Sequence, residues 1–276
     1  MNADLHSHST VSDGVLGPEE LALRAFRNGV DLWALTDHDD TSGLDLARAA
    51  AEELGLGWVS GVEISVTWRG QAVHVLGYGF DPQDVTLEAG LCAVRAGRAE
   101  RAKRIGALFE DLGIRDAYAG AMRFAPNPDS IGRTHFARLL VERGLFRDLQ
   151  SVFDAYLKPG RPAYVPHTWA EMGAAVQWIR GAGGVAVLAH PTRYRLSGAE
   201  LLELCAQFAD CGGTGIEVVS GPQRPQYASA MAKIARHFDL DASRGSDFHA
   251  PLESGVDLGR AQALPDGLRP LWERLP

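Results

Sequence analysis

Short apolar runs alternate with amphipathic stretches at both ends of the chain. A first strand is predicted to end at residues 5–8, and five further apolar runs predict buried strands at 31–36, 58–62, 72–76, 184–189 and 215–219. A further strand is expected before the Ser246-Asp247 pair. About seven strands with crossover helices favour a parallel α/β barrel. An open dinucleotide-binding sheet is disfavoured because no Gly-x-Gly-x-x-Gly follows the first strand.

The pattern changes at about residue 84. Long helical stretches are predicted at 85–112, 133–143 and 149–157, with prolines and no convincing strand between them. We therefore predict a mainly helical insertion at residues 85–162, with the barrel formed by 1–84 and 163–276.

The distribution of charge distinguishes these two parts. The 276 residues carry a net charge of −8, yet residues 95–161 hold 13 Lys and Arg against 8 Asp and Glu. An acidic body suits multivalent cations, and a basic segment within it suits a small anionic ligand. The negative net charge argues against long duplex nucleic acid as the main partner.

The sequence also predicts a compartment. No apolar run approaches the roughly 18 residues of a membrane span, and no signal-peptide pattern is expected at the start. The three cysteines have no Cys-x-x-Cys spacing, which favours incidental thiols in a reducing cytoplasm. No motif supports a cysteine nucleophile, and no oligomer surface can be identified from the pattern.

Histidine and carboxylate residues recur where strands are predicted to end. Six of the nine histidines lie at or within predicted strands: His6, His8, His38, His74, His190 and His249. Three acids accompany them: Asp13, Glu63 and Asp247. Each residue taken singly is as well explained by a core histidine or a helix cap. Together they predict an active site at the C-terminal rim of the barrel, where two or three ions share carboxylates. Imidazole and carboxylate ligands without thiolate suit Mn, Fe or Zn.

Five motifs resemble the polymerase-and-histidinol-phosphatase (PHP) superfamily: Asp4-Leu-His-Ser-His8, Thr36-Asp-His38, Gly61-Val-Glu63, Ala189-His-Pro191 and Ser246-Asp-Phe-His249. The resemblance implies a distorted seven-stranded β/α barrel with a trinuclear metal site. One ion would take His6, His8, Glu63 and Asp247. The second would take Asp13, His38 and His249, which we also predict to be the catalytic residues. The third would take His74 and His190, with Glu63 as a bridge. Many relatives have His in place of Asp13, and aspartate is also a competent ligand.

The predicted insertion indicates which branch of the superfamily the chain resembles. The segments 130–137 and 157–165 are similar to a branch that includes the 3′,5′-nucleoside bisphosphate phosphatases and RNase AM. That branch usually has Gly-Arg-Pro-His, whereas Thr134 replaces the proline here. The replacement is tolerable because threonine can cap a helix.

A helix that begins at Arg133 would offer free backbone amides and a guanidinium to one phosphate. We predict the following substrate-binding residues: Arg101, Lys103, Arg104, Arg133, Thr134, His135 and Lys158. Arg95 and Arg98 are expected on a solvated helix face. His167 and His237 have no assigned role, and Asp39 and Asp40 are expected either to support a helix entry or to contact the metal ligands from behind.

The resemblance implies removal of the 3′-phosphate from adenosine 3′,5′-bisphosphate by an in-line attack of activated water, with three divalent ions and manganese preferred over iron or zinc. A short 5′-phosphorylated RNA presents the same P–O3′ bond, so 5′→3′ exonuclease activity is a related expectation. The alternatives are a histidinol-phosphate phosphatase, an amidohydrolase and a non-catalytic nucleic-acid-binding module. An amidohydrolase needs no anion clamp and often uses a bridging lysine, and no lysine lies at a strand end here.

Overall fold

The computed structural model describes residues 1–275 of the chain. Its sheet has the order β1-β2-β3-β4-β6-β7-β8. The strands are β1 (Ala3–Asp4), β2 (Leu32–Leu35), β3 (Gly57–Trp68), β4 (Gln71–Tyr78), β6 (Val185–Leu188), β7 (Gly215–Ser220) and β8 (Asp241–Gly245). The short β5 (Ala170–Glu171) pairs with β3. The Leu5 N–H donates to the Arg244 carbonyl at 3.1 Å, which brings the two ends of the sheet together. The predicted seven-stranded α/β barrel is confirmed as a nearly closed barrel.

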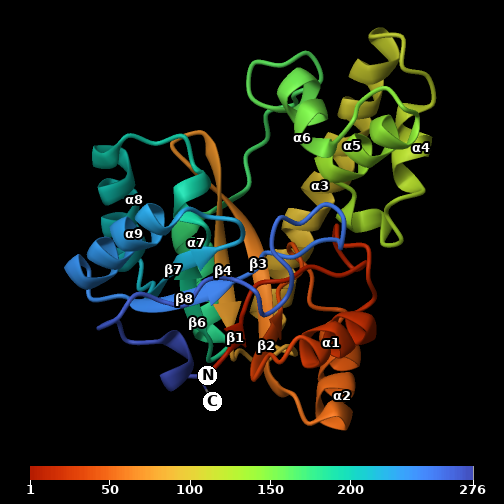
Figure 1. Cartoon of the computed structure of the whole chain (residues 1–276). Helices are drawn as coiled ribbons and strands as arrows, with labels where there is room; N and C mark the ends of the chain where they lie inside the picture. The colour runs from red at the N-terminus through yellow and green to blue at the C-terminus, as the bar shows by residue number, and fades with distance from the viewer. Residues whose placement is uncertain (276) are drawn as a thin grey trace.

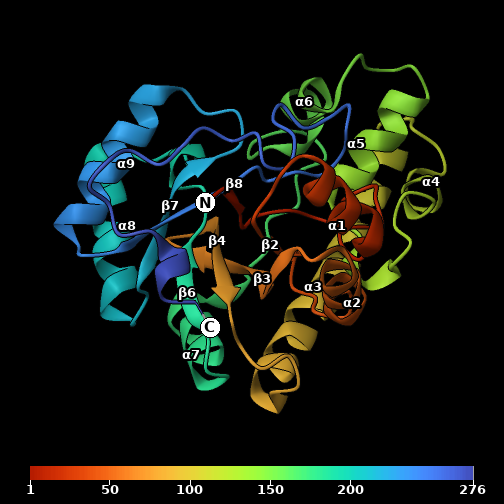
Figure 2. The same ribbon diagram turned by 60° about the horizontal axis from the view of Figure 1, so that its bottom comes forward.

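The helices fall into two groups: one group lies outside the sheet, and the other, between β4 and β5, extends beyond one end of it (Figures 1 and 2). The barrel helices are α1 (Pro18–Arg27), α2 (Leu44–Leu54), α7 (Met172–Gly181), α8 (Gly198–Asp210) and α9 (Pro225–His237). The insertion contains α3 (Val85–Asp111), α4 (Ala117–Met122), η1 (Pro128–Ser130), α5 (Arg133–Glu142), α6 (Leu149–Val152) and the π-helical turn η2 (Phe153–Leu157). Two further 3₁₀ turns are η3 (Pro191–Arg193) and η4 (Leu271–Glu273). Within residues 1–275, no helix combines the length and apolar character needed to cross a membrane.

The sequence predicted a parallel sheet, and this prediction was wrong for one strand. β4 runs antiparallel to both β3 and β6. The turn between β3 and β4 is Arg69-Gly70, with φ of 48° and 77°. Two residues with positive φ form a tight hairpin, and such a short connection cannot make a parallel crossover. As a consequence, Glu63 lies inside the long β3 and not at a strand end.

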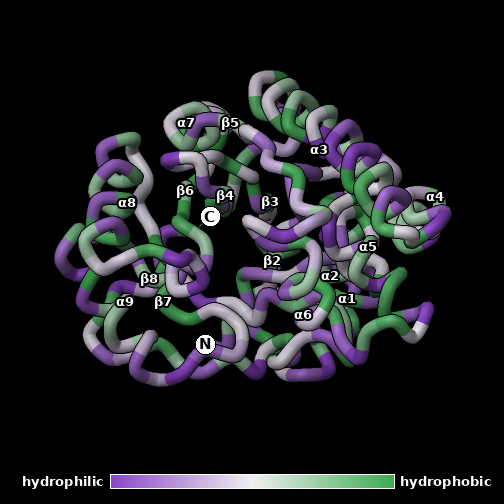
Figure 3. The backbone as a smooth tube through the Cα atoms, turned by 90° about the horizontal axis from the view of Figure 1, so that it is seen from above, coloured by the Kyte–Doolittle hydropathy of each residue, from purple (hydrophilic) through white to green (hydrophobic). Residues whose placement is uncertain are grey.

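The insertion has an apolar core of its own. Its buried members run from Ala102 to Val165 and form a cluster separate from the barrel clusters. Phe109 of α3 and Phe136 of α5 are fully buried there, and their rings stack with centroids 5.8 Å apart. Seen from above, α3, α4 and α5 lie on one side of the molecule, opposite α8 and α9 (Figure 3). The helices between β4 and β5 therefore pack on one another, while Leu87 and Leu91 at the start of α3 belong to the barrel core.

Replacing Phe109 tests this core. We expect Phe109→Ala to lower the free energy of unfolding by about 3–5 kcal/mol, because a buried aromatic ring leaves a cavity. Urea denaturation measures the loss, and hydrogen exchange should show faster exchange in α3 and α5 than in the barrel strands. Phe26→Ala on the exposed face of α1 is the control, since that ring is 47% exposed. Equal losses of unfolding free energy in Phe109→Ala and Phe26→Ala would show that Phe109 is not part of a buried core.

Candidate active site

The rim of the barrel gathers all nine predicted metal-binding side chains. The segments after β1, β2, β6 and β8 carry six of them: His6, His8, His38, His190, Asp247 and His249. Asp13 lies on the turn that follows His8, and the antiparallel strands β3 and β4 supply Glu63 and His74. The structure thus brings together side chains from residues 6 to 249.

Glu63 lies at the centre of this group and is fully buried. Its Oε2 faces three imidazole nitrogens at 3.0–3.3 Å, those of His6, His8 and His38. Its Oε1 faces two more at 2.8 Å, those of His74 and His190. One carboxylate therefore separates two sets of imidazoles, which is the arrangement expected of a bridging ligand.

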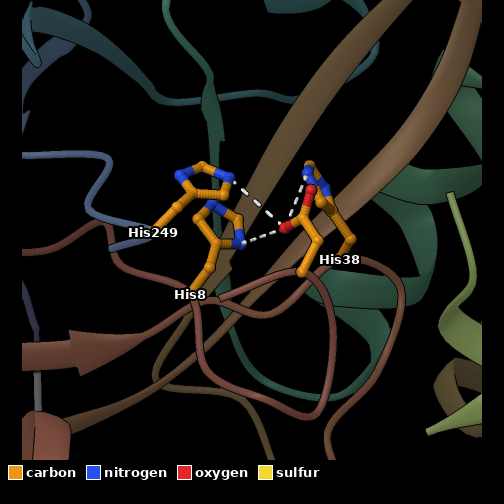
Figure 4. Close-up of side chains that lie close together, drawn as sticks. His8, His38 and His249 are labelled. Carbon is orange, nitrogen blue, oxygen red and sulfur yellow. Dashed lines mark ion pairs between the residues drawn. The ribbon is translucent and has the colours of Figure 1, made fainter. Parts of the chain in front are cut away.

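A second group of donors surrounds Asp13. Its Oδ1 lies 3.3 Å from Nε2 of His249 and 3.9 Å from both Nδ1 of His8 and Nε2 of His38. Figure 4 shows these three imidazoles turned toward one carboxylate. The set contains the predicted second-ion ligands, with His8 in addition.

A third group differs from the set implied by the family resemblance. Ligand atoms of His6, His190 and Asp247 lie within 4.8 Å of one another. The resemblance placed His190 with His74, whereas the geometry also brings His190 to Asp247. His6 and His8 both approach Oδ1 of Asp247, at 3.4 and 3.1 Å. His6, His8 and His190 are therefore each close to more than one group of candidate metal ligands.

The donor atoms fit divalent cations. Six buried atoms in this group have no hydrogen-bond partner within residues 1–275: Nε2 of His6, Nδ1 of His8, Oδ1 of Asp13, Nδ1 of His38, Oε2 of Glu63 and Nδ1 of His190. Buried polar atoms without partners are costly, and a bound cation would compensate these six. Ligands at 2.0–2.2 Å from a tetrahedral ion lie about 3.4 Å apart, close to the contacts around Glu63.

The pKa values in this group shift in both directions: the imidazole of His8 is neutral, whereas that of His249 holds a proton that a bound cation would displace. Burial, followed by the neighbouring His249, lowers the pKa of His8 to about 3, so its imidazole is neutral and free to coordinate. Burial opposes the charge of His249, but Asp13 and Asp247 raise its pKa to about 9. Although burial alone would raise it, the imidazoles of His74, His38 and His6 hold the pKa of Glu63 well below its usual range. The carboxylates are therefore anionic and attract cations.

Sequence reasoning missed Glu217, which supports the site from β7. This fully buried carboxylate accepts a hydrogen bond from Nδ1 of His6 at 2.9 Å and from the His190 N–H at 2.6 Å. The bond to Nδ1 fixes the tautomer of His6 and leaves its Nε2 free toward Glu63. An acid inside the apolar segment Gly215-Ile-Glu-Val-Val was the available signal.

The expectation that Arg95 and Arg98 lie on a solvated helix face was wrong. Nε of Arg98 donates to Asp39 at 2.6 Å, and its Nη2 donates to Oγ of Ser65 at 2.7 Å. Arg95 donates to the Asp39 carbonyl at 2.7 Å. These residues share a face of α3 with Arg101, and this face packs against the barrel rim. Asp39 also accepts from the Ser65 N–H, so it connects α3 to β3 beside His38.

Arg101 and Arg133 form the basic part of the site. They line a small recess together with Arg98, Gly132 and Trp169. Arg101 is buried and donates to the Val165 carbonyl at 3.0 Å. Burial and the nearby Arg133 and Arg98 lower the pKa of Arg101 to about 9.

The recess also lacks counter-charges for these two arginines. Arg133 donates to the Leu157 carbonyl at 3.3 Å. Across residues 1–275, neither Arg101 nor Arg133 forms an ion pair with a carboxylate. Buried cations without counter-charges indicate a site for an anion.

The other predicted substrate residues divide into two sets. Thr134 donates its hydroxyl to Oδ2 of Asp13 at 2.9 Å, and buried His135 accepts from the Gly132 N–H at 2.9 Å. By contrast, the structure does not bring Lys103, Arg104 or Lys158 to the recess. Lys103 and Arg104 are exposed on the outer face of α3, and Lys158 pairs with Asp154.

A barrel rim that carries converging imidazole and carboxylate donors, beside two buried arginines without counter-charges, is the arrangement expected of a metal-dependent hydrolase that acts on phosphate esters. The model of the family described as the PHP domain matches residues 4–159. The chain belongs to the PHP family, and this confirms the resemblance seen in its motifs.

Known relatives cover nearly the whole chain. A 3′,5′-nucleoside bisphosphate phosphatase from Chromobacterium violaceum is 49% identical over 99% of this chain and 96% of its own length. The 5′-3′ exoribonuclease Rnm from Escherichia coli is 40% identical over 98% of this chain and 92% of its own. A solved C. violaceum structure, described as an amidohydrolase with bound sulfate and no metal, superimposes with a TM-score of 0.96 at 47% identity, covering 99% and 95% of the two chains.

Replacing Glu217 tests its role in orienting His6. We expect Glu217→Gln to weaken metal affinity about 10–100-fold, because an amide cannot accept both hydrogen bonds. Competition with a fluorescent chelator measures the affinity. Glu203→Gln on exposed α8 serves as the control. An unchanged affinity would show that Glu217 has only a packing role.

Replacing Arg98 tests the connection between α3 and the rim. Arg98→Ala leaves the Asp39 carboxylate buried without its cation, so we expect unfolding free energy to fall by roughly 3–5 kcal/mol. Thermal and urea denaturation measure it, with the exposed Arg104→Ala as control. Adding Asp39→Asn to Arg98→Ala should recover part of the loss. If the unfolding free energy of the double variant falls by the sum of the two single losses, Arg98 and Asp39 do not stabilise each other.

Proposed function

We propose that this protein is a metal-dependent phosphatase that removes the 3′-phosphate from nucleoside 3′,5′-bisphosphates, for example converting adenosine 3′,5′-bisphosphate to AMP. The observation that carries this proposal is the pair of unneutralised guanidiniums, Arg101 and Arg133, placed beside the metal-ligand group. The C. violaceum phosphatase at 49% identity supports the same substrate class.

The nine rim residues are proposed to hold three divalent ions, with manganese preferred and iron or zinc as alternatives. When bound, such ions lower the pKa of water and neutralise phosphoryl oxygens. Glu63 is the proposed bridge, because its two oxygens face different imidazoles. The number of ions, the identity of the metal and a cytoplasmic location stay predictions.

Substrate would approach from the side of Asp13, His38 and His249. Their side chains are 12–23% exposed, whereas those of His6 and His8 are fully buried. We assign the first three residues to the reacting phosphoryl group, as predicted from the sequence. Thr134 joins Asp13 to the start of α5, so the reacting phosphate and the anion recess have a defined separation.

In this assignment Arg101 and Arg133 bind the 5′-phosphate. Binding energy from a group that does not react can position the other phosphate and thereby raise the rate. Water attacks phosphorus, the P–O3′ bond breaks, and the O3′ atom of the departing nucleotide accepts a proton from a rim residue or water.

A second activity on short RNA follows from the same geometry. A 5′-phosphorylated oligoribonucleotide has a P–O3′ bond after its first nucleotide, at the same distance from its 5′-phosphate. The name of the E. coli relative, a 5′-3′ exoribonuclease, favours this activity. The proposed partners are therefore a small nucleotide and short single-stranded RNA.

The basic recess also separates this proposal from its alternatives. Histidinol phosphate has one phosphate and leaves the Arg101 and Arg133 recess without a function. An amidohydrolase, as the C. violaceum neighbour is described, requires no anion pocket. A non-catalytic module would not need all nine donors to be present and converging.

Phosphate release from manganese-loaded protein tests the proposed function. The substrates are adenosine 3′,5′-bisphosphate, AMP, histidinol phosphate, an aryl phosphate and a 5′-phosphorylated RNA trinucleotide. We expect strong preference for the bisphosphate, and Arg133→Ala should reduce its turnover about 10–100-fold through loss of a charge-assisted hydrogen bond. The aryl phosphate should be almost unaffected.

Arg123→Ala is the matched control, because this exposed arginine of the insertion pairs with Glu142 away from the recess. Equal losses on the bisphosphate and the aryl phosphate would contradict the 5′-phosphate clamp. Turnover of histidinol phosphate alone would retain the phosphatase class but overturn the proposed substrate.

A further inference from the structure

A cavity of about 600 Å³ opens beside the metal-ligand group. Asp247 and His249 form part of its wall, so it is continuous with the proposed site of reaction. The insertion contributes Phe153, and the segment that begins α9 contributes Arg224 and Tyr227. None of these three residues has a role in the function proposed above.

The acids in this cavity already have partners. Glu253 receives three hydrogen bonds from Arg138 of α5: Nε donates to Oε1 at 3.0 Å and to Oε2 at 3.2 Å, and Nη2 donates to Oε2 at 2.7 Å. Asp247 pairs with Arg193. Arg224 is exposed, and no carboxylate within residues 1–275 pairs with it. Arg224 is therefore a cation without a counter-charge on the wall of this cavity.

Two aromatic rings line the same space. Tyr227 on α9 is 46% exposed, which leaves its ring available to a ligand. Phe153 comes from the opposite side, where the guanidinium of Arg133 lies 5.5 Å from its ring centroid. Aromatic faces with nearby cations bind single-stranded nucleic acid with little dependence on sequence, because every base has a π-face.

The reaction determines which part of an RNA would occupy this cavity. Breaking the P–O3′ bond releases the first nucleotide with its O3′ atom. The phosphorus gains the oxygen of water and stays attached to the next nucleotide through O5′. The 5′-phosphate of the first nucleotide lies at Arg101 and Arg133, and the remaining chain extends from phosphorus on the side of Asp247 and His249, toward Arg224 and Tyr227. The cavity bounded by His249 and Asp247 begins at that point.

We propose that this cavity binds the nucleotide on the 3′ side of the scissile phosphate in a single-stranded oligoribonucleotide. Tyr227 and Phe153 supply surfaces for stacking, and Arg224 contacts the next phosphodiester. This inference rests on the proposed phosphoesterase function and extends it, because these residues decide between oligonucleotide and mononucleotide substrates.

Kinetics of two substrates test the inference. We expect Arg224→Ala and Tyr227→Ala each to reduce kcat/KM for a 5′-phosphorylated trinucleotide about 10-fold, with adenosine 3′,5′-bisphosphate changed less than about twofold. Tyr227→Phe should retain trinucleotide turnover, since its ring still stacks. Lys233→Ala is the matched charge control, because Lys233 is exposed on α9 and does not line the cavity.

Binding supplies a readout that does not depend on turnover. The probe is a fluorescent 5′-phosphorylated trinucleotide that carries CH₂ in place of the scissile O3′ and cannot be cleaved. Wild-type protein should bind it more tightly than the matching bisphosphate analogue, and Arg224→Ala should remove that advantage.

The outcomes separate the two proposals. Equal losses on both substrates would place the first nucleoside in the cavity and overturn the inference. Bisphosphate turnover with no added affinity for the trinucleotide would also overturn it, while leaving the proposed phosphatase function intact. Trinucleotide affinity that depends on Arg224 in a protein without bisphosphatase activity would support the cavity assignment and contradict the proposed function.

Discussion

The burial of the Glu63 carboxylate among imidazoles is the constraint on which the rest of this structure depends. A carboxylate without solvent is tolerated only when charge or hydrogen bonds compensate it. Here five imidazoles from four segments converge on its two oxygens. These imidazoles lie between residues 6 and 190 of the chain, and they meet only when the barrel is nearly closed. The fold and the site therefore require each other.

The insertion completes the site because it is held to the same rim. Arg98 reaches Asp39, Thr134 reaches Asp13, and Arg138 reaches Glu253. These contacts come from both α3 and α5, which share one apolar core. The metal ligands and the unneutralised arginines therefore occupy defined positions relative to each other, as a substrate with two phosphates would require.

Local signals were sufficient for much of the fold. Apolar runs predicted the main strands, and α3 begins where Asp84 accepts hydrogen bonds from the Thr86 and Leu87 N–H groups. The direction of β4 was not predicted, since the period-2 pattern of a strand is the same in either direction. The Arg69-Gly70 turn decides that direction, because two residues with positive φ make a tight hairpin.

The sequence alone determined the identity of the candidate metal-binding groups and their order, because imidazole and carboxylate chemistry resides in single residues and recurring motifs. Only the tertiary structure decided which arginines face the site. Arg98 and Arg104 lie on one helix, and the packing of α3 against the rim turns the first inward and the second to solvent. Glu217 acquired its role in the same way, because its neighbours His6 and His190 are distant in sequence and meet only when β7 joins the barrel.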